Sequence, residues 1–145
     1  MKEAKNTTSK IQSHLKMTKV GEHITLDIIG TTKEYDPLVF EKVIKEIAKA
    51  AKVTILNISK YKFEPQGFTI LALLAESHIS FHTFPENGII SFDFFTCGKV
   101  NPSVAIDIIK KNFKHKRIVK KEFNRDTKSL YHDIYSSPGL QKSYV

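Results

Sequence analysis

The sequence predicts an α+β protein, a two-layer α/β sandwich in which a mostly antiparallel sheet carries two helices on one face. Strand-like segments, some of them alternating between apolar and polar residues, recur along most of the chain. Two other segments place their apolar residues at helical spacing, and both follow a capping residue and a proline. The hairpin-rich stretch between these helices favours antiparallel pairing. The second face of such a sheet would need cover, which a partner chain could supply.

Six segments are expected to form strands. In residues 23–29 the apolar residues Ile24, Leu26 and Ile28 alternate with polar ones, which is typical of a half-buried strand. The other strands are expected at residues 53–63, 68–75, 78–84, 89–97 and 117–123. Turns are expected at residues 64–67, which contain proline and glycine, and at residues 86–88, whose asparagine–glycine pair is favoured in hairpins.

Two amphipathic helices are expected to cover the sheet. Asp36 and Pro37 form a favourable helix start, because the carboxylate can cap the first turn and proline suits the first helical position. The apolar face of this helix consists of Phe40, Val43, Ile44, Ile47, Ala48 and Ala51. The same start recurs at Asn101 and Pro102. The second helix has an apolar face of Val104, Ala105, Ile108 and Ile109.

Length and composition indicate one globular domain. The chain has 145 residues, 41% of them hydrophobic, and its clearest apolar run, residues 70–75, is too short to cross a bilayer. The lysine-rich start lacks the apolar segment of a secretory signal. A single cysteine cannot form an internal disulfide, so a cytoplasmic location is expected. We expect a flexible N-terminal extension at residues 1–20, a domain at residues 21–125 and a C-terminal tail at residues 126–145.

The net charge of +8 is concentrated in the last third of the chain. Residues 1–98 carry 12 basic and 11 acidic side chains, whereas residues 99–145 carry 11 basic and 4 acidic ones. Such a segment could contact nucleic acid or another anionic surface. The simpler interpretation, a solvated helix end and an edge strand guarded by lysines, is favoured.

Residues with reactive side chains are concentrated between residues 76 and 98. Glu76-Ser77-His78 is followed by His82 and then by Thr96-Cys97-Gly98, which brings a hydroxyl, two imidazoles and a thiol into one stretch. In residues 78–82 the polar side chains His78, Ser80 and His82 alternate with the apolar Ile79 and Phe81. Ser77 precedes His82 by five positions, so in an uninterrupted strand the two would point to opposite faces. A bulge or bend at Glu76-Ser77 is therefore expected if they cooperate, and a distorted peptide bond there would favour cleavage.

These motifs closely resemble the prokaryotic S-adenosylmethionine decarboxylase family. The resemblance covers about residues 21–125 and rests on Glu76-Ser77-His78, His82 and Thr96-Cys97-Gly98. It implies a self-processing enzyme that makes a pyruvoyl cofactor from Ser77 by cutting its chain between residues 76 and 77, without pyridoxal phosphate or a metal. The implied reaction is decarboxylation of S-adenosylmethionine for spermidine biosynthesis. The implied assembly is a homodimer of cleaved protomers.

The resemblance also implies a route for chain cleavage. The Ser77 hydroxyl attacks the carbonyl of Glu76 and converts the peptide into an ester. His82 then helps to remove the Ser77 α-proton, a task that suits an imidazole near neutral pH. Elimination and hydrolysis leave the pyruvoyl group and ammonia. Thr69 occupies the position of a hydroxyl residue that assists processing in the family, and it equally fits an ordinary β-branched strand residue.

Other residues are implied for the decarboxylation itself. The pyruvoyl carbonyl would form a Schiff base with the substrate amine and accept electrons as carbon dioxide leaves. Cys97, which shares a strand face with Asp93, is expected to give a proton to the α-carbon. Phe63 and Phe84 match aromatic stacking positions for an adenine and a sulfonium, although family members often have tryptophan in place of Phe84. Glu86 matches a carboxylate that holds the ribose hydroxyls.

Two alternative functions are open from the sequence. Relatives of the family act on arginine or ornithine with the same machinery, although Phe63, Phe84 and Glu86 favour a nucleoside. A basic α/β module that binds RNA through its sheet is compatible with the element order and the basic last third. The glycine–aromatic signature of RNA-stacking sheets is absent, however, so nucleic-acid binding is not favoured.

Overall fold

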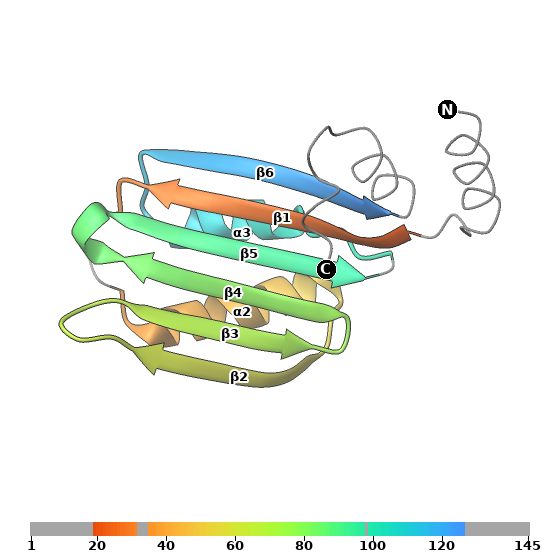
Figure 1. Cartoon of the computed structure of the whole chain (residues 1–145), viewed down its shortest axis with the longest axis horizontal. Coiled ribbons are helices and arrows are strands. Elements are labelled where there is room, and N and C mark those ends of the chain that lie inside the picture. The colour runs from red at the N-terminus through yellow and green to blue at the C-terminus, as the bar shows by residue number, and fades with distance from the viewer. Residues whose placement is uncertain (1–18, 32–34, 98, 127–145) are drawn as a thin grey trace, which may run out of the picture. The chain divides into compact units, whose positions relative to one another are not determined.

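A six-stranded sheet forms the centre of the structure, a computed structural model that describes residues 19–31, 35–97 and 99–126. Its strands are β1 (Lys19–Ile29), β2 (Ile55–Lys62), β3 (Phe68–Leu74), β4 (Ser77–Phe84), β5 (Ile89–Cys97) and β6 (Arg117–Asp126). They lie in the order β2-β3-β4-β5-β1-β6 (Figure 1). Apart from the strand ends Lys19–Val20 and Asp126, the predicted extension and tail lie outside the described residues.

Antiparallel pairing holds these strands from β2 across to β1, as the hairpin-rich sequence predicts. β4 lies between β3 and β5, and every residue from Ser77 to Phe84 has a partner on β5. A two-residue turn joins β3 to β4, because Leu74 pairs directly with Ser77. The predicted strand at residues 23–29 is longer in the structure, since β1 stays paired with β5 as far as Gly21 opposite Cys97.

Both helices lie on one face of the sheet, as predicted (Figure 1). They are α2 (Pro37–Ala51) and α3 (Val104–Asn112). The Asp36 carboxylate caps α2 by accepting a hydrogen bond from the Leu38 amide at 2.9 Å. The Asn101 side chain makes the same contact with the Ser103 amide at 3.0 Å. There the chain first forms a tight turn, with a hydrogen bond from the Ala105 amide to the Pro102 carbonyl, so α3 begins later than the cap motif indicates.

The loop between β4 and β5 differs from the predicted asparagine–glycine hairpin. Residues Pro85–Asn87 form a single 3-10 turn, and only Gly88 adopts a left-handed conformation, with φ of 61°. The Gly88 carbonyl accepts hydrogen bonds from the amides of Gly30 and Thr31. A Cβ at Gly88 would lie 2.6 Å from the Thr31 carbonyl oxygen, so this close approach of two loops requires glycine.

The core lies between the sheet and the two helices. Phe40 on α2 is fully buried at its centre, with its ring centroid 4.8 Å from that of Phe68 and 5.2 Å from that of Phe81, both edge-to-face. The Phe113 ring, just after α3, lies 4.8 Å away on the other side. The helices are therefore joined to β3 and β4 through one aromatic cluster.

An ion-pair cluster adds a second link between α2 and the edge strand β2. Lys60 Nζ lies 2.7 Å from Glu41 Oε2, and Lys45 Nζ lies 3.0 Å from Glu41 Oε1. Hydrogen bonds from Lys60 and Lys45 lower the pKa of Glu41 from 4.5 to about 2. The carboxylate thus stays charged, and the link stays intact, down to strongly acidic pH.

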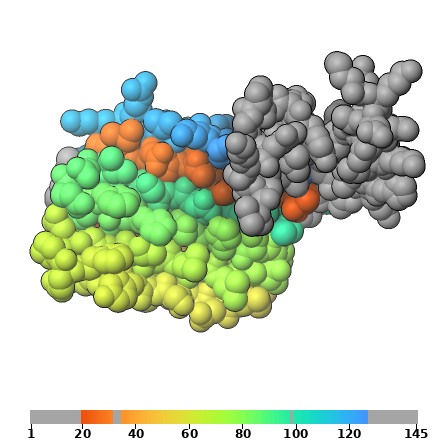
Figure 2. Space-filling view, in the orientation of Figure 1, coloured from red at the N-terminus to blue at the C-terminus, as the bar shows by residue number. Residues whose placement is uncertain are grey.

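The opposite face of the sheet carries no helix in the described part of the chain. Figure 2 shows this helix-free face, on which β2, β3, β4 and β5 reach the surface. Alternation sorts the side chains as predicted, since the burial pattern along β5 alternates and puts Phe92 and Phe94 in the core. The helix-free face has polar groups on its central strands, whereas Leu71 and Leu73 on β3 are exposed there. No helix among the described residues is long and apolar enough to span a membrane.

We expect Phe40→Ala to lower the free energy of unfolding by about 3–5 kcal/mol, because it empties the centre of the aromatic cluster. Leu38→Ala on the same helix is the matched control, since Leu38 is 64% exposed, and its effect should stay within about 0.5 kcal/mol. Urea unfolding of both variants measures the difference. Equal losses would show that the core is not centred on Phe40.

Candidate active site

The Glu76–Ser77 peptide bond lies at the end of the β3–β4 hairpin. Ala75 and Glu76 form the two-residue turn, and Ser77 is the first residue of β4. Ser77 has φ of 151°, a value that residues with a side chain rarely adopt and that costs about 1–3 kcal/mol. β4 continues from there in unbroken register, so the expected distortion is confined to Ser77 itself.

Neighbouring strands hold Glu76 on both sides. The Cys97 amide donates a hydrogen bond to the Glu76 carbonyl oxygen at 2.9 Å. The Glu76 side chain turns the other way, where its Oε2 accepts a hydrogen bond from the Thr54 amide at 3.0 Å. The Ala75 amide in turn donates to the Thr54 carbonyl at 3.0 Å. The carbonyl that Ser77 would have to attack is thus fixed in place and polarised by a backbone donor.

Cys97 ends β5 beside this turn. Its side chain is exposed and free of disulfides, whereas the preceding Thr96 is fully buried and pairs with Ser77. Alternation along β5 puts Cys97 on the helix-free face together with Asp93. The thiol is therefore open to a ligand on that face, in agreement with the face that the sequence predicts.

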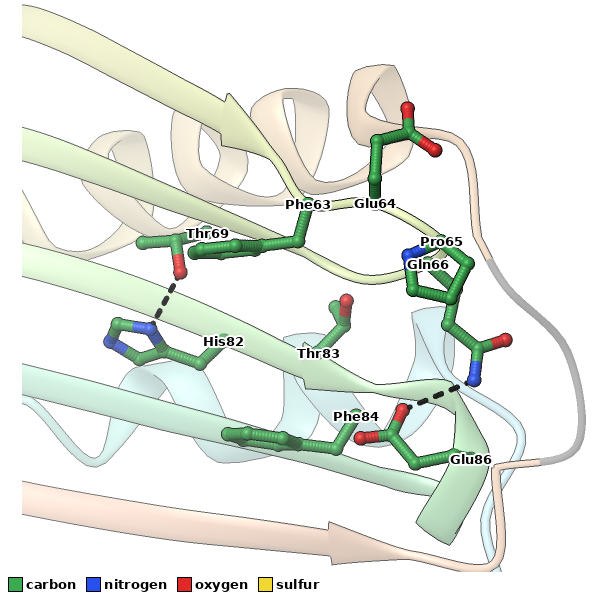
Figure 3. Close-up of a pocket in the computed structure, with 9 residues that line it drawn as sticks. All are labelled: Phe63, Glu64, Pro65, Gln66, Thr69, His82, Thr83, Phe84 and Glu86. Carbon is green, nitrogen blue, oxygen red and sulfur yellow. Dashed lines mark hydrogen bonds between the residues drawn. The ribbon is translucent and has the colours of Figure 1, made fainter.

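A pocket of about 590 Å³ lies at the opposite end of the same strands, within the size range of small-molecule sites. It is lined by Phe63, Glu64, Pro65, Gln66, Thr69, His82, Thr83, Phe84 and Glu86 (Figure 3). All three predicted substrate-contact residues and the predicted processing pair of Thr69 and His82 are therefore in one cavity. The sequence did not point to the four remaining lining residues.

The β2–β3 turn and the end of β4 build this pocket. Gly67, with φ of 88°, lets the turn close with a hydrogen bond from the Phe63 amide to the Gly67 carbonyl at 2.8 Å. Phe63 and Phe84 remain 48% and 41% exposed, so both rings offer faces to a ligand. Figure 3 shows the two rings extending from their strand ends toward His82.

Two polar contacts orient side chains in the pocket. Thr69 and His82 are directly paired across β3 and β4, and Thr69 Oγ1 lies 2.8 Å from His82 Nδ1. The Glu86 carboxylate accepts a long hydrogen bond of 3.5 Å from Gln66 Nε2. An imidazole held by a hydroxyl can move a proton, and a carboxylate at the rim can accept hydrogen bonds from a ligand.

The structure does not bring Ser77 and His82 together within one chain. They lie five residues apart on a continuous strand, which corresponds to roughly 16 Å. Glu76, Ser77 and Cys97 form one cluster, which we call the cleavage end. Thr69, His82, Phe63, Phe84 and Glu86 form the other, which we call the pocket end.

A further group of polar residues lies beside the cleavage end. His23, His78 and Asp93 contact one another on three adjacent strands. The sequence places His78 and Asp93 on the helix-free face but does not reveal their contact, because strand order is not a local property. Among the described residues no group of His, Cys, Asp and Glu side chains is arranged to hold a metal ion.

Comparisons with known proteins identify the family of this chain. The sequence model of the S-adenosylmethionine decarboxylase family matches residues 22–126. The S-adenosylmethionine decarboxylase proenzyme of Prochlorococcus marinus (strain MIT 9313) is 41% identical over 111 residues, covering 74% of this chain and 89% of that protein. The proenzyme of Methanococcus maripaludis (strain C7) is 40% identical over 105 residues, covering 70% and 86%.

A solved structure extends the similarity to the fold. The crystal structure of the adenosylmethionine decarboxylase from Aquifex aeolicus is 34% identical to this chain, with a TM-score of 0.66 over 74% of this chain and 92% of the other. The fold and the clustered residues define a small α+β protein with a serine of unusual backbone conformation beside a tight turn, and a pocket at the other end of the same strands. The chain belongs to the S-adenosylmethionine decarboxylase family.

Proposed function

We propose that this chain is the proenzyme of an S-adenosylmethionine decarboxylase that cuts itself between Glu76 and Ser77 and then releases carbon dioxide from S-adenosylmethionine. The product would be decarboxylated S-adenosylmethionine, the aminopropyl donor for spermidine synthesis. The observation that carries this proposal is the hydrogen bond from the Cys97 amide to the Glu76 carbonyl, beside a serine with an unusual backbone conformation. The named relatives support the same activity.

The cleavage end has the parts that an internal acyl transfer needs. The Ser77 oxygen attacks the Glu76 carbonyl carbon, and negative charge develops on the carbonyl oxygen. The Cys97 amide already points at that oxygen and can stabilise the charge without rearrangement. The carbon–nitrogen bond then breaks, leaving Glu76 esterified to the Ser77 side chain. The unfavourable backbone conformation of Ser77 can relax once this bond is broken, which also favours the reaction.

The chemistry of these residues fits a pyruvoyl group at position 77. Only a serine, threonine or cysteine can begin the acyl transfer, and Ser77 follows the polarised carbonyl directly. When present, that group supplies an electron-accepting carbonyl, so that neither pyridoxal phosphate nor a metal is required. Cys97 follows Thr96, the β5 partner of Ser77, which supports Cys97 as the proton donor to that group. A thiol in this role must stay reduced, so we propose a cytoplasmic location.

The pocket end suits a nucleoside that carries a cation. Phe63 and Phe84 offer aromatic faces, which attract an adenine by stacking and a sulfonium by cation–π interaction. Glu86 lies at the rim, where its carboxylate can accept hydrogen bonds from ribose hydroxyls. The cations of arginine and ornithine could also contact an aromatic face and a carboxylate, but neither amino acid has a purine ring to stack or ribose hydroxyls for Glu86. These features support S-adenosylmethionine over the two amino acids.

A second copy of the chain is needed to complete the site. Within one chain roughly 16 Å of strand separates Ser77 from His82. If the helix-free faces of two copies pack together in opposite directions, the cleavage end of one meets the pocket end of the other. His82 of the partner subunit could then remove the Ser77 α-proton, with Thr69 holding its ring. We therefore propose a homodimer with two shared sites.

The direct test is intact-mass analysis of purified protein combined with a carbon dioxide assay. We expect fragments of residues 1–76 and 77–145, the second blocked by a pyruvoyl group, and release of carbon dioxide from S-adenosylmethionine but not from arginine or ornithine. Ser77→Ala should remain one inactive chain. A fully active, uncut wild-type chain would contradict the mechanism, and activity on arginine alone would contradict the substrate.

Mixed dimers test the shared site. Differently tagged His82→Ala and Ser77→Ala chains are coexpressed, and dimers carrying both tags are purified. One site then combines an intact Ser77 with an intact His82, so we expect cleavage of only the His82→Ala chain. Each variant expressed alone should stay uncut or, for His82→Ala, stop at the ester. If verified mixed dimers show no cleavage, the two residues do not act across subunits.

Cys97→Ser should separate cleavage from turnover. The variant keeps the backbone amide that contacts Glu76, so we expect it to be cut. Its turnover should fall by about 100-fold or more, because a hydroxyl is a far weaker acid than a thiol. Misdirected protonation should also leave an ordinary alanine at position 77, which mass spectrometry of the substrate-exposed fragment detects. Wild-type turnover of the cut variant would assign the proton to another group.

A further inference from the structure

His78 and Asp93 form a chain of contacts that ends on the Ser77 hydroxyl. His78 Nδ1 lies 3.4 Å from Ser77 Oγ, and His78 Nε2 lies 2.8 Å from Asp93 Oδ1. The other carboxylate oxygen, Oδ2, lies 2.6 Å from His23 Nε2. The three residues come from β4, β5 and β1, which are neighbours in the sheet. A nucleophile, an imidazole and a carboxylate thus follow one another in space.

The carboxylate determines which nitrogen of His78 faces the serine as an acceptor. An ionised carboxylate can only accept hydrogen bonds, so the neutral His78 ring must carry its proton on Nε2. Nδ1 then has a free lone pair directed at Ser77 Oγ. The same reasoning puts a proton on Nε2 of His23, which leaves Asp93 held by two donors. The imidazole is therefore oriented as a proton acceptor for Ser77.

The Phe95 ring lies beside both imidazoles. Its centroid lies 5.5 Å from that of His23 and 6.1 Å from that of His78. The His78 and Asp93 side chains are 38% and 28% exposed, so part of the group is accessible on the helix-free face. The contacts with Asp93 and Ser77 favour the observed orientation of the His78 ring.

We propose that His78 is the general base for the first step of self-cleavage, with Asp93 and His23 as positioning residues. The inference rests on the proposed function, in which Ser77 attacks Glu76. As the bond from Ser77 Oγ to the Glu76 carbonyl carbon forms, the hydroxyl proton moves to His78 Nδ1. As the Glu76–Ser77 carbon–nitrogen bond breaks, the same proton passes to the departing Ser77 nitrogen. The step ends with an ester, a free amine and a neutral His78, so no other reactant is consumed.

In this proposal the two histidines act in different steps of self-cleavage. His78 acts before the ester exists, on the hydroxyl proton of its own chain. His82 acts on the α-proton after the ester has formed, from the partner subunit in the proposed dimer. A purely structural role for His78, as a hydrogen-bonding link between β4 and β5, predicts instead that any side chain able to contact Asp93 would be sufficient.

His78→Gln distinguishes the two roles. A glutamine amide can reach the position of Nε2 and keep the contact with Asp93, but it has no proton acceptor in the position of Nδ1. We expect cleavage of newly synthesised chain to slow by about 100-fold, with an unchanged unfolding midpoint and dimer content. His115→Gln is the matched control, since His115 contacts the Phe113 carbonyl away from the site, and it should be cut at the wild-type rate.

If His78→Gln does not fold, His78→Asn decides the question, because asparagine can accept a hydrogen bond from Ser77 but cannot take its proton. Because asparagine also loses the contact with Asp93, the base is supported if the folded asparagine variant is cut more slowly than Asp93→Asn. Cleavage as fast as that of Asp93→Asn, or wild-type cleavage of folded His78→Gln, overturns it. Hydroxylamine, which cuts esters, should not cut His78→Gln but should cut His82→Ala. Rapid hydroxylamine cleavage of His78→Gln would show that the ester forms without His78.

Asp93→Asn tests the positioning role. An amide can donate to one imidazole, which favours a proton on the wrong nitrogen and should slow cleavage by about 10-fold or more. Because Asp93 acts through His78, the double variant with His78→Gln should be no slower than His78→Gln alone. Additive losses would indicate a separate structural role for Asp93. A wild-type chain that is never cut would reject the proposed function itself, whereas normal cleavage of His78→Gln would reject only the base.

Discussion

The continuous pairing of β4 is the constraint on which the rest of the structure depends. β4 is hydrogen-bonded to β3 on one side and to β5 on the other, and it begins at the cleavable bond and ends at the pocket. A strand paired on both sides cannot shorten or fold back, so the distance between Ser77 and His82 is a property of the sheet. The candidate functional residues are consequently divided between two ends of one strand, and in the proposed homodimer a second copy of the chain would bring them together.

β4 also contains the residue with an unfavourable backbone conformation, Ser77. Ser77 is held by pairing with Leu74 and Thr96, and the adjacent Glu76 carbonyl by the Cys97 amide. The aromatic core around Phe40 and Phe81 packs against β3 and β4 on the face that the helices cover. The packing of the whole sheet therefore offsets the free-energy cost of the Ser77 backbone conformation, as is common for reactive sites. Cleavage would release one end of β4 without disturbing that core.

The helix-free face carries the polar cluster and is the surface through which we propose that two chains associate. Polar groups on β4, β5 and β1 contact one another there, whereas exposed leucines of β3 lie beside them. Among the described residues no buried side-chain nitrogen or oxygen lacks a hydrogen-bond partner. On this face the Asp93 carboxylate is bound by His23 and His78, so a second copy could cover that cluster without leaving the carboxylate unpaired.

The sequence by itself determined the element types, the alternation of side chains along the strands, the cap of α2 and the reactive motif. Those features depend on neighbouring residues, such as Asp36 before Pro37 or the alternation that leads to Cys97. Only the tertiary structure decided that Phe63 and Phe84 line one pocket, that Asp93 joins His23 to His78, and that Ser77 lies far from His82. Each of these relations depends on strand order and register, which are set by pairing between distant segments and leave no periodic signal in the sequence.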